Sequence, residues 1–222
     1  IGGSGLYEMD DLTDVRAISV ATPFGKPSDD YIRGMLGKTE IIFLPRHGRG
    51  HRLLPAEINH RANIFGFKTL GVDRIIGVSA VGSLREELRP RDLVLPDQFF
   101  DRTKASSGHT FFGRGLAAHV AFAEPICQRL RSTLREIGTR VIENDKQYRG
   151  IQIHDRGTYV NMEGPAFSTR AESDFHRKQG FDIIGMTSLA EAKLCREAEI
   201  CYALLALVTD YDCWREEEAP VT

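Results

Sequence analysis

The chain has 222 residues, of which 41% are hydrophobic and 27% are charged, and its formal net charge is −2. This length and composition are typical of one ordinary globular domain that buries a sizeable core. The near balance of 29 basic and 31 acidic residues gives no overall field that would recruit nucleic acid or an anionic membrane, so any anion must be bound by local groups.

Short apolar runs alternate along the chain with amphipathic segments. The apolar runs predict strands at 41–44, 74–78, 93–95, 158–160, 182–184 and 200–208. The amphipathic segments predict one helix over about Ala56 to Leu70 and another from Pro125 to Gly138. A third helix is expected to begin with the capping-box pattern Ser188-Leu189-Ala190-Glu191. The alternation indicates a single α/β domain whose mixed, mostly parallel sheet carries helices on both faces.

The four cysteines, at positions 127, 195, 201 and 213, form no CxxC pair and have no partner at the spacing of metal ligands. We therefore expect free thiols in a reducing compartment, with Cys195 and Cys201 as small buried side chains, and no metal site. No apolar stretch approaches the roughly 18 residues of a membrane span, and we expect no signal peptide. These features predict a cytoplasmic protein.

The most informative segment is the apolar run 200–208, which ends in Thr209-Asp210-Tyr211-Asp212. A buried strand then delivers two carboxylates at its carboxyl end, which is costly unless the carboxylates are paired or used. In open α/β sheets this edge is where ligands bind. The alternative is a turn in which both aspartates are simply solvated.

Groups that suit an anion follow the other predicted strands. Arg46 and His47 follow the strand at 41–44, and a guanidinium matches phosphate oxygens while an imidazole can donate or move a proton. Ser79 follows the strand at 74–78, and Thr187 leads into a helix whose amino end favours an anion. Ser4 lies in the turn Gly2-Gly3-Ser4-Gly5, which lacks the third glycine and the acidic partner of a dinucleotide fingerprint. A solvated basic loop remains the alternative for residues 46–51.

Taken together, these strand ends predict a two-part site. Phosphate donors lie on one side of the sheet edge, and the carboxylates of Asp210 and Asp212 lie on the other. This arrangement suits displacement at a carbon between them, in which phosphate attacks and the acid protonates the leaving group.

Six segments of the chain resemble the 5′-methylthioadenosine phosphorylases, which belong to the trimeric purine nucleoside phosphorylases. The likeness extends over essentially the whole chain and is carried by residues 22–28, 46–51, 82–86, 97–103, 163–172 and 209–214. The resemblance implies the α/β fold already expected, over one phosphorylase domain at residues 1–222. It also implies that the first strand begins before Ile1 and that a helix covering the 5′ pocket follows Thr222.

The resemblance further implies the roles of individual residues. The phosphate site would contain Ser4, Arg46, His47, Ser79, Ala80 and Thr187. The nucleoside site would contain His51, Phe167, Ser168, Met186, Asp210 and Asp212, with His119 reaching in from a neighbouring subunit of a homotrimer or a dimer of trimers. Asp210 and His47 would be the catalytic pair. No metal or other cofactor is implied, because inorganic phosphate is a co-substrate.

The implied reaction is phosphorolysis of 5′-methylthioadenosine to adenine and 5-methylthioribose 1-phosphate, a step of methionine and purine salvage. Relatives that act on 6-oxopurines generally have glutamate in place of Ser168 and asparagine in place of Asp210. An ionised aspartate can only accept hydrogen bonds, which suits the 6-amino group of adenine, and a protonated one can protonate purine N7. A methylthioinosine or 6-oxopurine phosphorylase is the nearest alternative; a nucleosidase and a nucleotide-binding regulatory module are less favoured. Ser4 and Ser79 stand where the family usually has threonine, so a hydroxyl is kept.

Overall fold

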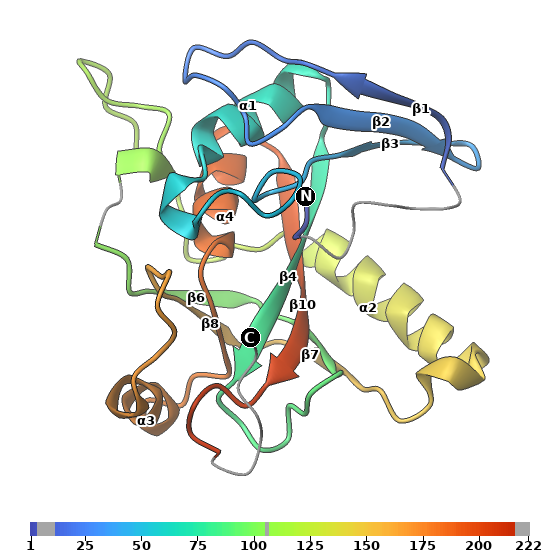
Figure 1. Cartoon of the computed structure of the whole chain (residues 1–222), viewed down its shortest axis with the longest axis vertical. Helices are drawn as coiled ribbons and strands as arrows, with labels where there is room; N and C mark the ends of the chain where they lie inside the picture. Colours follow the sequence, from blue (N-terminus) through green and yellow to red (C-terminus); the bar gives the residue numbers. More distant parts are fainter. Residues whose placement is uncertain (4–11, 105–106, 216–222) are drawn as a thin grey trace.

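The computed structural model describes residues 1–3, 12–104 and 107–215 (Figure 1). Within these residues the strands form two sheets. A small antiparallel sheet has the order β1 (Thr13–Ile18), β2 (Tyr31–Leu36), β3 (Thr39–Phe43). The larger sheet has the order β6-β8-β9-β4-β10-β5-β7, with bounds β4 (Arg74–Ser83), β5 (Leu93–Leu95), β6 (Gln98–Asp101), β7 (Ile153–Asp155), β8 (Thr158–Asn161), β9 (Ile183–Gly185) and β10 (Cys201–Asp210).

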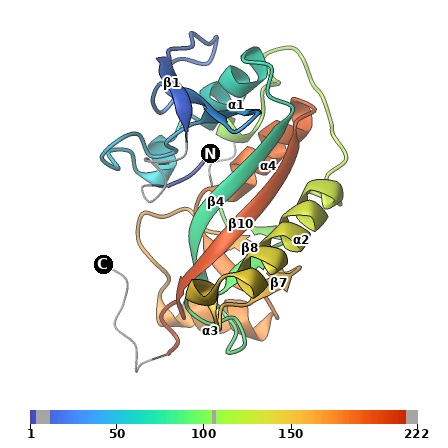
Figure 2. The same ribbon diagram turned by 90° about the vertical axis from the view of Figure 1, so that its right-hand side faces the viewer.

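The larger sheet is built around β4 and β10, two long parallel strands that lie side by side (Figure 2). Of the six neighbouring pairs in this sheet, β5 with β10 and β9 with β4 are antiparallel, and the other four are parallel. Ala203, Leu204 and Ala206 of β10 are fully buried, because helices cover both faces of this strand pair. The predicted mixed, mostly parallel sheet is confirmed.

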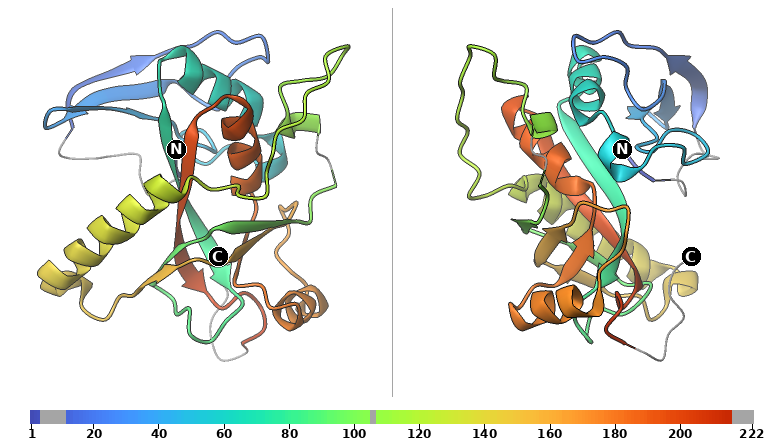
Figure 3. Two further views of the ribbon diagram at one scale, coloured as in Figure 1. Left: turned by 180° about the vertical axis from the view of Figure 1, so that it is seen from behind. Right: turned by 60° about the vertical axis from the view of Figure 1, so that its left-hand side comes forward.

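Helices lie on opposite sides of the paired strands β4 and β10 (Figures 1 and 3). On one side α4 (Ser188–Glu197) packs against the strands and α1 (His60–Thr69) packs against α4, while α2 (Gln128–Asn144) lies on the other side. The short helix α3 (Arg170–Lys178) lies near the carboxyl end of β10. Three 3-10 turns, η2 (Pro55–Glu57), η3 (Ser107–His109) and η4 (Lys146–Tyr148), complete the described elements. None of the described helices is long and apolar enough to cross a membrane.

The first residues of the chain pair as a strand between the two sheets. Gly2 forms parallel bridges with both Pro45 and Val78. The Arg46 amide donates to the Gly2 carbonyl at 2.9 Å, and the Val78 amide donates to the Ile1 carbonyl at 2.9 Å. Three segments that are distant in sequence therefore run side by side toward the same edge.

Several predicted boundaries were wrong. The helix predicted from Ala56 to Leu70 is split into η2 and α1, and Asn59 caps α1 by accepting a 3.1 Å bond from the Ala62 amide. The helix predicted to end at Gly138 begins at Gln128 and continues to Asn144. A Cβ on Gly138 would lie 2.8 Å from Ile153 Cδ1, so this glycine permits close packing of α2 on β7 instead of ending the helix. Strands β1, β2, β6 and β7 were not predicted, and β1 is largely exposed, so it carries no apolar pattern.

The expectation of free thiols was wrong for two of the four cysteines. Cys127, which precedes α2, forms a disulfide with Cys201 at the start of β10, 74 residues later, whereas Cys195 is buried and unpaired as predicted. The packing of α2 on β10 brings the two Cα atoms to 5.4 Å, within the range a disulfide needs. Sequence spacing does not reveal such a contact. The prediction of a cytoplasmic protein rested partly on free thiols, and the disulfide removes that support.

Candidate active site

The predicted phosphate residues gather where three parallel segments run side by side. Arg46 and His47 follow the last residue of the β3 segment, and the Arg46 guanidinium donates through Nη1 to the Val78 carbonyl at 3.0 Å. Ser79 and Ala80 come directly after Val78. They lie inside β4 and not beyond its end, because the strand continues to Ser83.

One predicted phosphate residue cannot be placed. Ser4 lies outside the residues that the structure describes. The described residues before it end at Gly3, and the carbonyl of the preceding Gly2 accepts a bond from the Arg46 amide.

Arg46 is buried and its guanidinium is held by a carboxylate that was not predicted to take part. Nε and Nη2 both donate to Glu191 of α4, with Nη2 to Oε2 at 3.1 Å, and the Tyr202 hydroxyl donates to the same Oε2 at 2.9 Å. The side chains of Arg46 and Glu191 are 1% and 0% exposed. Burial opposes the ionisation of Glu191, but the charge and hydrogen bonds of Arg46 outweigh it, and the pKa of Glu191 falls below its ordinary value.

The capping box predicted at the start of α4 was therefore wrong. Thr187, not Ser188, is the N-cap residue, and its own side chain makes no capping hydrogen bond. Glu191 points into the core toward Arg46 and does not return to the helix end. The sequence held a signal for this contact, because an acidic residue on an apolar helix face between Ala190 and Ala192 is rarely buried without a partner.

His47 lies beside Arg46 and its tautomer is set by one contact. Nδ1 is 2.9 Å from the Leu53 carbonyl oxygen, which can only accept, so Nδ1 carries the proton. Burial is the main cause that lowers the pKa of His47, the charges of His51 and Arg46 add to it, and the bond to Leu53 opposes it. The neutral ring presents a lone pair at Nε2 that can accept a proton from a protonated phosphate oxygen.

The turn from β9 into α4 brings Met186 and Thr187 to the same region. Thr187 is buried, and Glu191 lies about one helical turn beyond it, so Thr187 lies near the Arg46 network. Asn161 holds this turn: its Nδ2 donates to the Met186 carbonyl at 3.1 Å, and its Oδ1 accepts from the Leu189 amide at 3.1 Å. The Asn161 side chain was not predicted as part of the site.

Further along the same strands, at their carboxyl end, Asp210 is the last residue of β10 and lies opposite Gly82 of β4. Its Oδ1 accepts from the Asp212 amide at 2.7 Å and its Oδ2 accepts from the Thr209 hydroxyl at 2.7 Å. Burial raises the pKa of Asp210 and the charge of Asp212 adds to the rise, while the two hydrogen bonds oppose it. The raised pKa favours a protonated carboxyl, which the predicted proton transfer requires.

Asp212 and Ser168 lie beside one another and have unused polar atoms. The Cys213 thiol lies 3.3 Å from the Ser168 carbonyl, which joins the loop of residues 167–168 to the segment after β10. Among the described residues, Asp212 Oδ2 and Ser168 Oγ are buried without a hydrogen-bond partner. Phe167 beside them is 68% exposed. Asp210 is part of β10 and both aspartates are partly buried, which disfavours the alternative of two fully solvated aspartates in a simple turn.

The pairing of β4 with β10 sets the distance between the predicted phosphate residues and Asp210. Ser79 pairs with Ala206 and Gly82 pairs with Asp210, so the phosphate residues and Asp210 lie three residues apart along one strand. At the rise of a β-strand this is about 10 Å.

Two predicted histidines lie at the margin of the site. His51 is exposed and stacks on His47, with ring centroids 4.2 Å apart. His119 is exposed and lies two residues before Ala121, whose carbonyl accepts a 3.2 Å bond from Arg196 of α4. A single chain does not bring His119 to the site.

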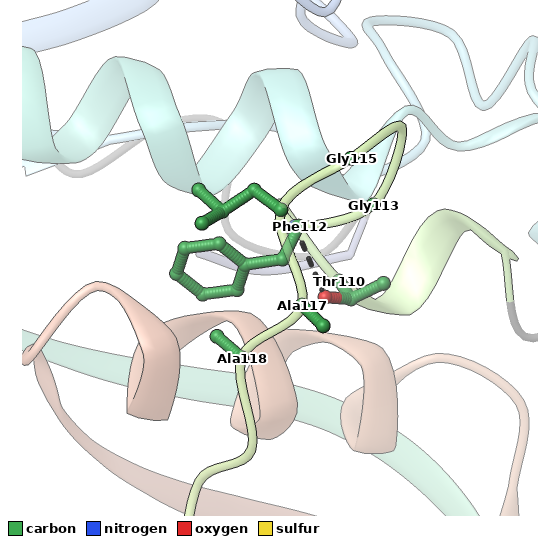
Figure 4. Close-up of a pocket in the computed structure, with 7 residues that line it drawn as sticks. Thr110, Phe112, Gly113, Gly115, Ala117 and Ala118 are labelled. Carbon is green, nitrogen blue, oxygen red and sulfur yellow. Dashed lines mark hydrogen bonds between the residues drawn. The ribbon is translucent and has the colours of Figure 1, made fainter.

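The segment before His119 forms a surface pocket of about 410 Å³, lined by residues 110, 112, 113 and 115–118 (Figure 4). The Phe112 amide donates to the Thr110 hydroxyl across its base at 3.1 Å. No predicted site residue lines this pocket. In the described part of the chain, no cluster of three or more histidine, cysteine or acidic side chains is placed to bind a metal ion.

Comparison with known proteins gives consistent matches over the whole chain. The model of the phosphorylase superfamily matches residues 1–222. The chain is 58% identical to the S-methyl-5′-thioadenosine phosphorylase of Geobacter sulfurreducens and 59% identical to that of Gloeobacter violaceus, covering all of this chain and 75% and 73% of those proteins. It therefore spans about three quarters of the length of these relatives.

Solved structures agree. A methylthioadenosine phosphorylase from an Antarctic soil metagenomic library superposes with a TM-score of 0.92 at 52% identity, over 100% of this chain and 75% of that one. A variant of the adenosine/methylthioadenosine phosphorylase of Schistosoma mansoni, crystallised with methylthioadenosine, gives a TM-score of 0.89 at 40% identity, over 96% of this chain and 80% of that one.

Proposed function

The chain belongs to the phosphorylase superfamily, and from this membership and the site geometry we propose that it cleaves 5′-methylthioadenosine with inorganic phosphate. The products are adenine and 5-methylthioribose 1-phosphate, so the enzyme is a pentosyltransferase of methionine and purine salvage. The observation that carries the proposal is the contact of Arg46 with Val78 in the middle of β4, a few residues along the strand pair from Asp210 at the carboxyl end of β10.

Phosphate binding is assigned to the Arg46 end. Arg46 supplies the charge, and the Ser79 hydroxyl, the Ala80 backbone and Thr187 surround the anion together with Ser4. A phosphate oxygen attacks C1′ of the ribose as the bond to the purine breaks, and the bound anion stabilises the positive charge that develops on the ribose. Neutral His47 takes up the proton of a singly protonated phosphate, which leaves a better nucleophile.

The departing purine receives its proton from Asp210 at N7. The Thr209 hydroxyl lies 2.7 Å from Asp210 Oδ2 and 3.2 Å from the Val81 carbonyl. Because a hydroxyl has one hydrogen, Thr209 donates to Val81 while Asp210 is protonated and to Asp210 once the proton has gone. The same contacts thus support both protonation states of the acid.

Selection of adenine is assigned to the unused atoms of this half of the site. Asp212 Oδ2 is a buried acceptor without a partner, and a 6-amino group donates to it whereas a 6-oxo group cannot. Ser168 Oγ offers a second contact, Phe167 covers the base, and Met186 lies along the ribose. An unmatched buried polar group is costly, so this pairing discriminates strongly.

The oligomeric part of the proposal concerns His119 and His51. We assign the chain to a homotrimer or a dimer of trimers in which His119 of one subunit closes the 5′ side of the next site, where His51 also lies. The exposure of the segment that carries His119 supports this assignment.

The direct test is incubation of the protein with 5′-methylthioadenosine, with and without phosphate, followed by measurement of free adenine. We expect release only with phosphate, in equal amount to 5-methylthioribose 1-phosphate. Methylthioinosine and inosine serve as 6-oxopurine comparisons and should react far more slowly. Release of adenine without phosphate, or no release at all, would overturn the proposal.

The role of Asp210 is tested by Asp210→Asn. Loss of the acid should lower kcat/KM for 5′-methylthioadenosine by about 10²- to 10⁴-fold, and the carboxamide should shift the preference toward 6-oxo nucleosides, because it donates to their carbonyl. The measurement is the ratio of kcat/KM for methylthioadenosine to that for methylthioinosine. An unchanged ratio contradicts the assigned role.

A further inference from the structure

The contact between Arg46 and Glu191 places a carboxylate beside the proposed phosphate site. Glu191 accepts bonds from Arg46 Nε and Nη2 and from the Tyr202 hydroxyl, and all three side chains are buried. A guanidinium has five N–H groups, and the bonds to Glu191 and to the Val78 carbonyl use three of them. By this count one N–H on each terminal nitrogen has no partner among these groups, and an anion oxygen can accept from such a group.

A negative charge at this place has two opposite effects on phosphate. By charge alone it partly cancels the charge of Arg46 and weakens the attraction for an anion. By geometry it fixes the guanidinium plane, so that the remaining N–H groups are presented in one orientation. The two effects predict opposite changes when the charge of Glu191 is removed.

The strand beneath the network is shaped to admit it. A Cβ on Gly77 of β4 would lie 2.4 Å from the Tyr202 hydroxyl oxygen and 3.2 Å from Glu191 Oε2. Any larger residue at this position would displace Tyr202 or Glu191. The space at Gly77 thus lets Tyr202 of β10 bond to the carboxylate of Glu191 on α4, which in turn binds the Arg46 guanidinium.

We infer that Glu191, supported by Tyr202, is a positioning residue that orients Arg46 toward phosphate. This inference rests on the proposed function, since it takes Arg46 as the phosphate ligand. It assigns a role to Glu191 and Tyr202, neither of which was among the predicted site residues.

The central variant is Glu191→Gln, which keeps the shape and removes the charge. If positioning dominates, KM for phosphate rises about 10- to 100-fold, the range seen when a partner that orients a ligand group is lost. KM for 5′-methylthioadenosine at saturating phosphate changes less than about threefold. An unchanged or lower KM for phosphate means that only charge compensation operates, and it overturns the inference.

Two further variants complete the test. Tyr202→Phe keeps the ion pair and removes one bond to Oε2, so KM for phosphate should rise by a smaller factor while KM for 5′-methylthioadenosine again changes little. If Glu191→Gln does not fold, Tyr202→Phe decides the question. Equal changes in both KM values, or no change in either, then count against positioning. Glu199→Gln removes an equal charge from an exposed residue just beyond α4 and should leave both KM values unchanged. If wild-type protein releases no adenine in a phosphate-dependent way, the proposed function itself is refuted. This result is distinct from the failure of the positioning role, which is measured in an active wild-type enzyme.

Discussion

At the scale of single residues, His60 is a titratable side chain inside the core. It is the first residue of α1, is 8% exposed, and its Nδ1 has no hydrogen-bond partner among the described residues. Burial is the main cause that lowers the pKa of His60 from 6.5 to about 4; Glu191 opposes the shift, and Arg46 adds to it. The ring is therefore neutral in the folded protein near neutral pH, whereas in the unfolded chain it titrates at its ordinary value.

This difference predicts a pH dependence of stability. Because the folded-state pKa is the lower one, the unfolded chain binds the proton first as pH falls below about 6.5. Stability is complete above that pH and decreases until about pH 4, by on the order of 3 kcal/mol for this residue. The check is urea unfolding of wild type and His60→Gln at several pH values between 7.5 and 5. The free energy of unfolding should fall more steeply with decreasing pH in wild type than in His60→Gln. The same pH dependence of the free energy of unfolding in wild type and His60→Gln contradicts the prediction.

At the scale of elements, the segment after β10 is anchored to the segment after β4. Asp212 has a positive φ of 52° and turns the chain back, the Tyr211 hydroxyl donates to the Glu86 carbonyl at 3.2 Å, and Trp214 Nε1 donates to the Ser83 carbonyl at 2.8 Å. The Arg177 guanidinium of α3 lies 3.7 Å from the centre of the Trp214 ring, at a distance suited to a cation–π contact. The motifs at 82–86 and 209–214 thus support one another and fix both aspartates.

Trp214→Phe should loosen this support without touching the phosphate half of the site. We expect kcat/KM for 5′-methylthioadenosine to fall about tenfold, the effect of losing one buried hydrogen bond, while KM for phosphate stays constant. Trp214 is the only tryptophan of the chain, so fluorescence reports on it alone. Arg177→Met should change the emission maximum, and Arg140→Met on the exposed face of α2 should not. Unaltered nucleoside kinetics in Trp214→Phe would count against this support.

At the scale of the whole molecule, the Cys127–Cys201 disulfide ties α2 to the start of the central strand. It closes a loop over 74 residues, which in the chain-entropy description lowers the free energy of the folded state relative to the unfolded state by about 4 kcal/mol. The bridge is distant in the strand from Asp210, at the opposite end of β10. It therefore bears on stability more than on the reaction.

The prediction is that Cys127→Ser lowers the free energy of unfolding by up to about 4 kcal/mol, with kcat nearly unchanged. Dithiothreitol should lower the urea midpoint of wild type to that of the variant and leave the variant unaffected. Thiol titration of the unfolded wild-type protein should find two free thiols, those of Cys195 and Cys213. Four free thiols, or a wild-type midpoint that dithiothreitol does not move, contradict the prediction.

Much of the architecture could be predicted because it depends on patterns among residues that are close in sequence. Apolar runs and amphipathic periods report on strands and helices through the sequence alone, and the carboxylates after 200–208 pointed to a ligand-binding strand end. Strands without such a pattern, such as β1, were missed, and β4 was predicted too short, because its polar Ser79 and Ser83 hide the continuation of the strand.

The sequence by itself determined the α/β class, the residues at the strand ends and the resemblance that pointed to a nucleoside and phosphate. Only the tertiary structure decided which side chains hold those residues. Glu191 lies 145 residues from Arg46, and Cys201 lies 74 residues from Cys127. Local periodicity reports on the face that a residue presents, whereas the partner it meets there depends on how distant elements pack. The orientation of Arg46 and the disulfide belong to this second kind of information.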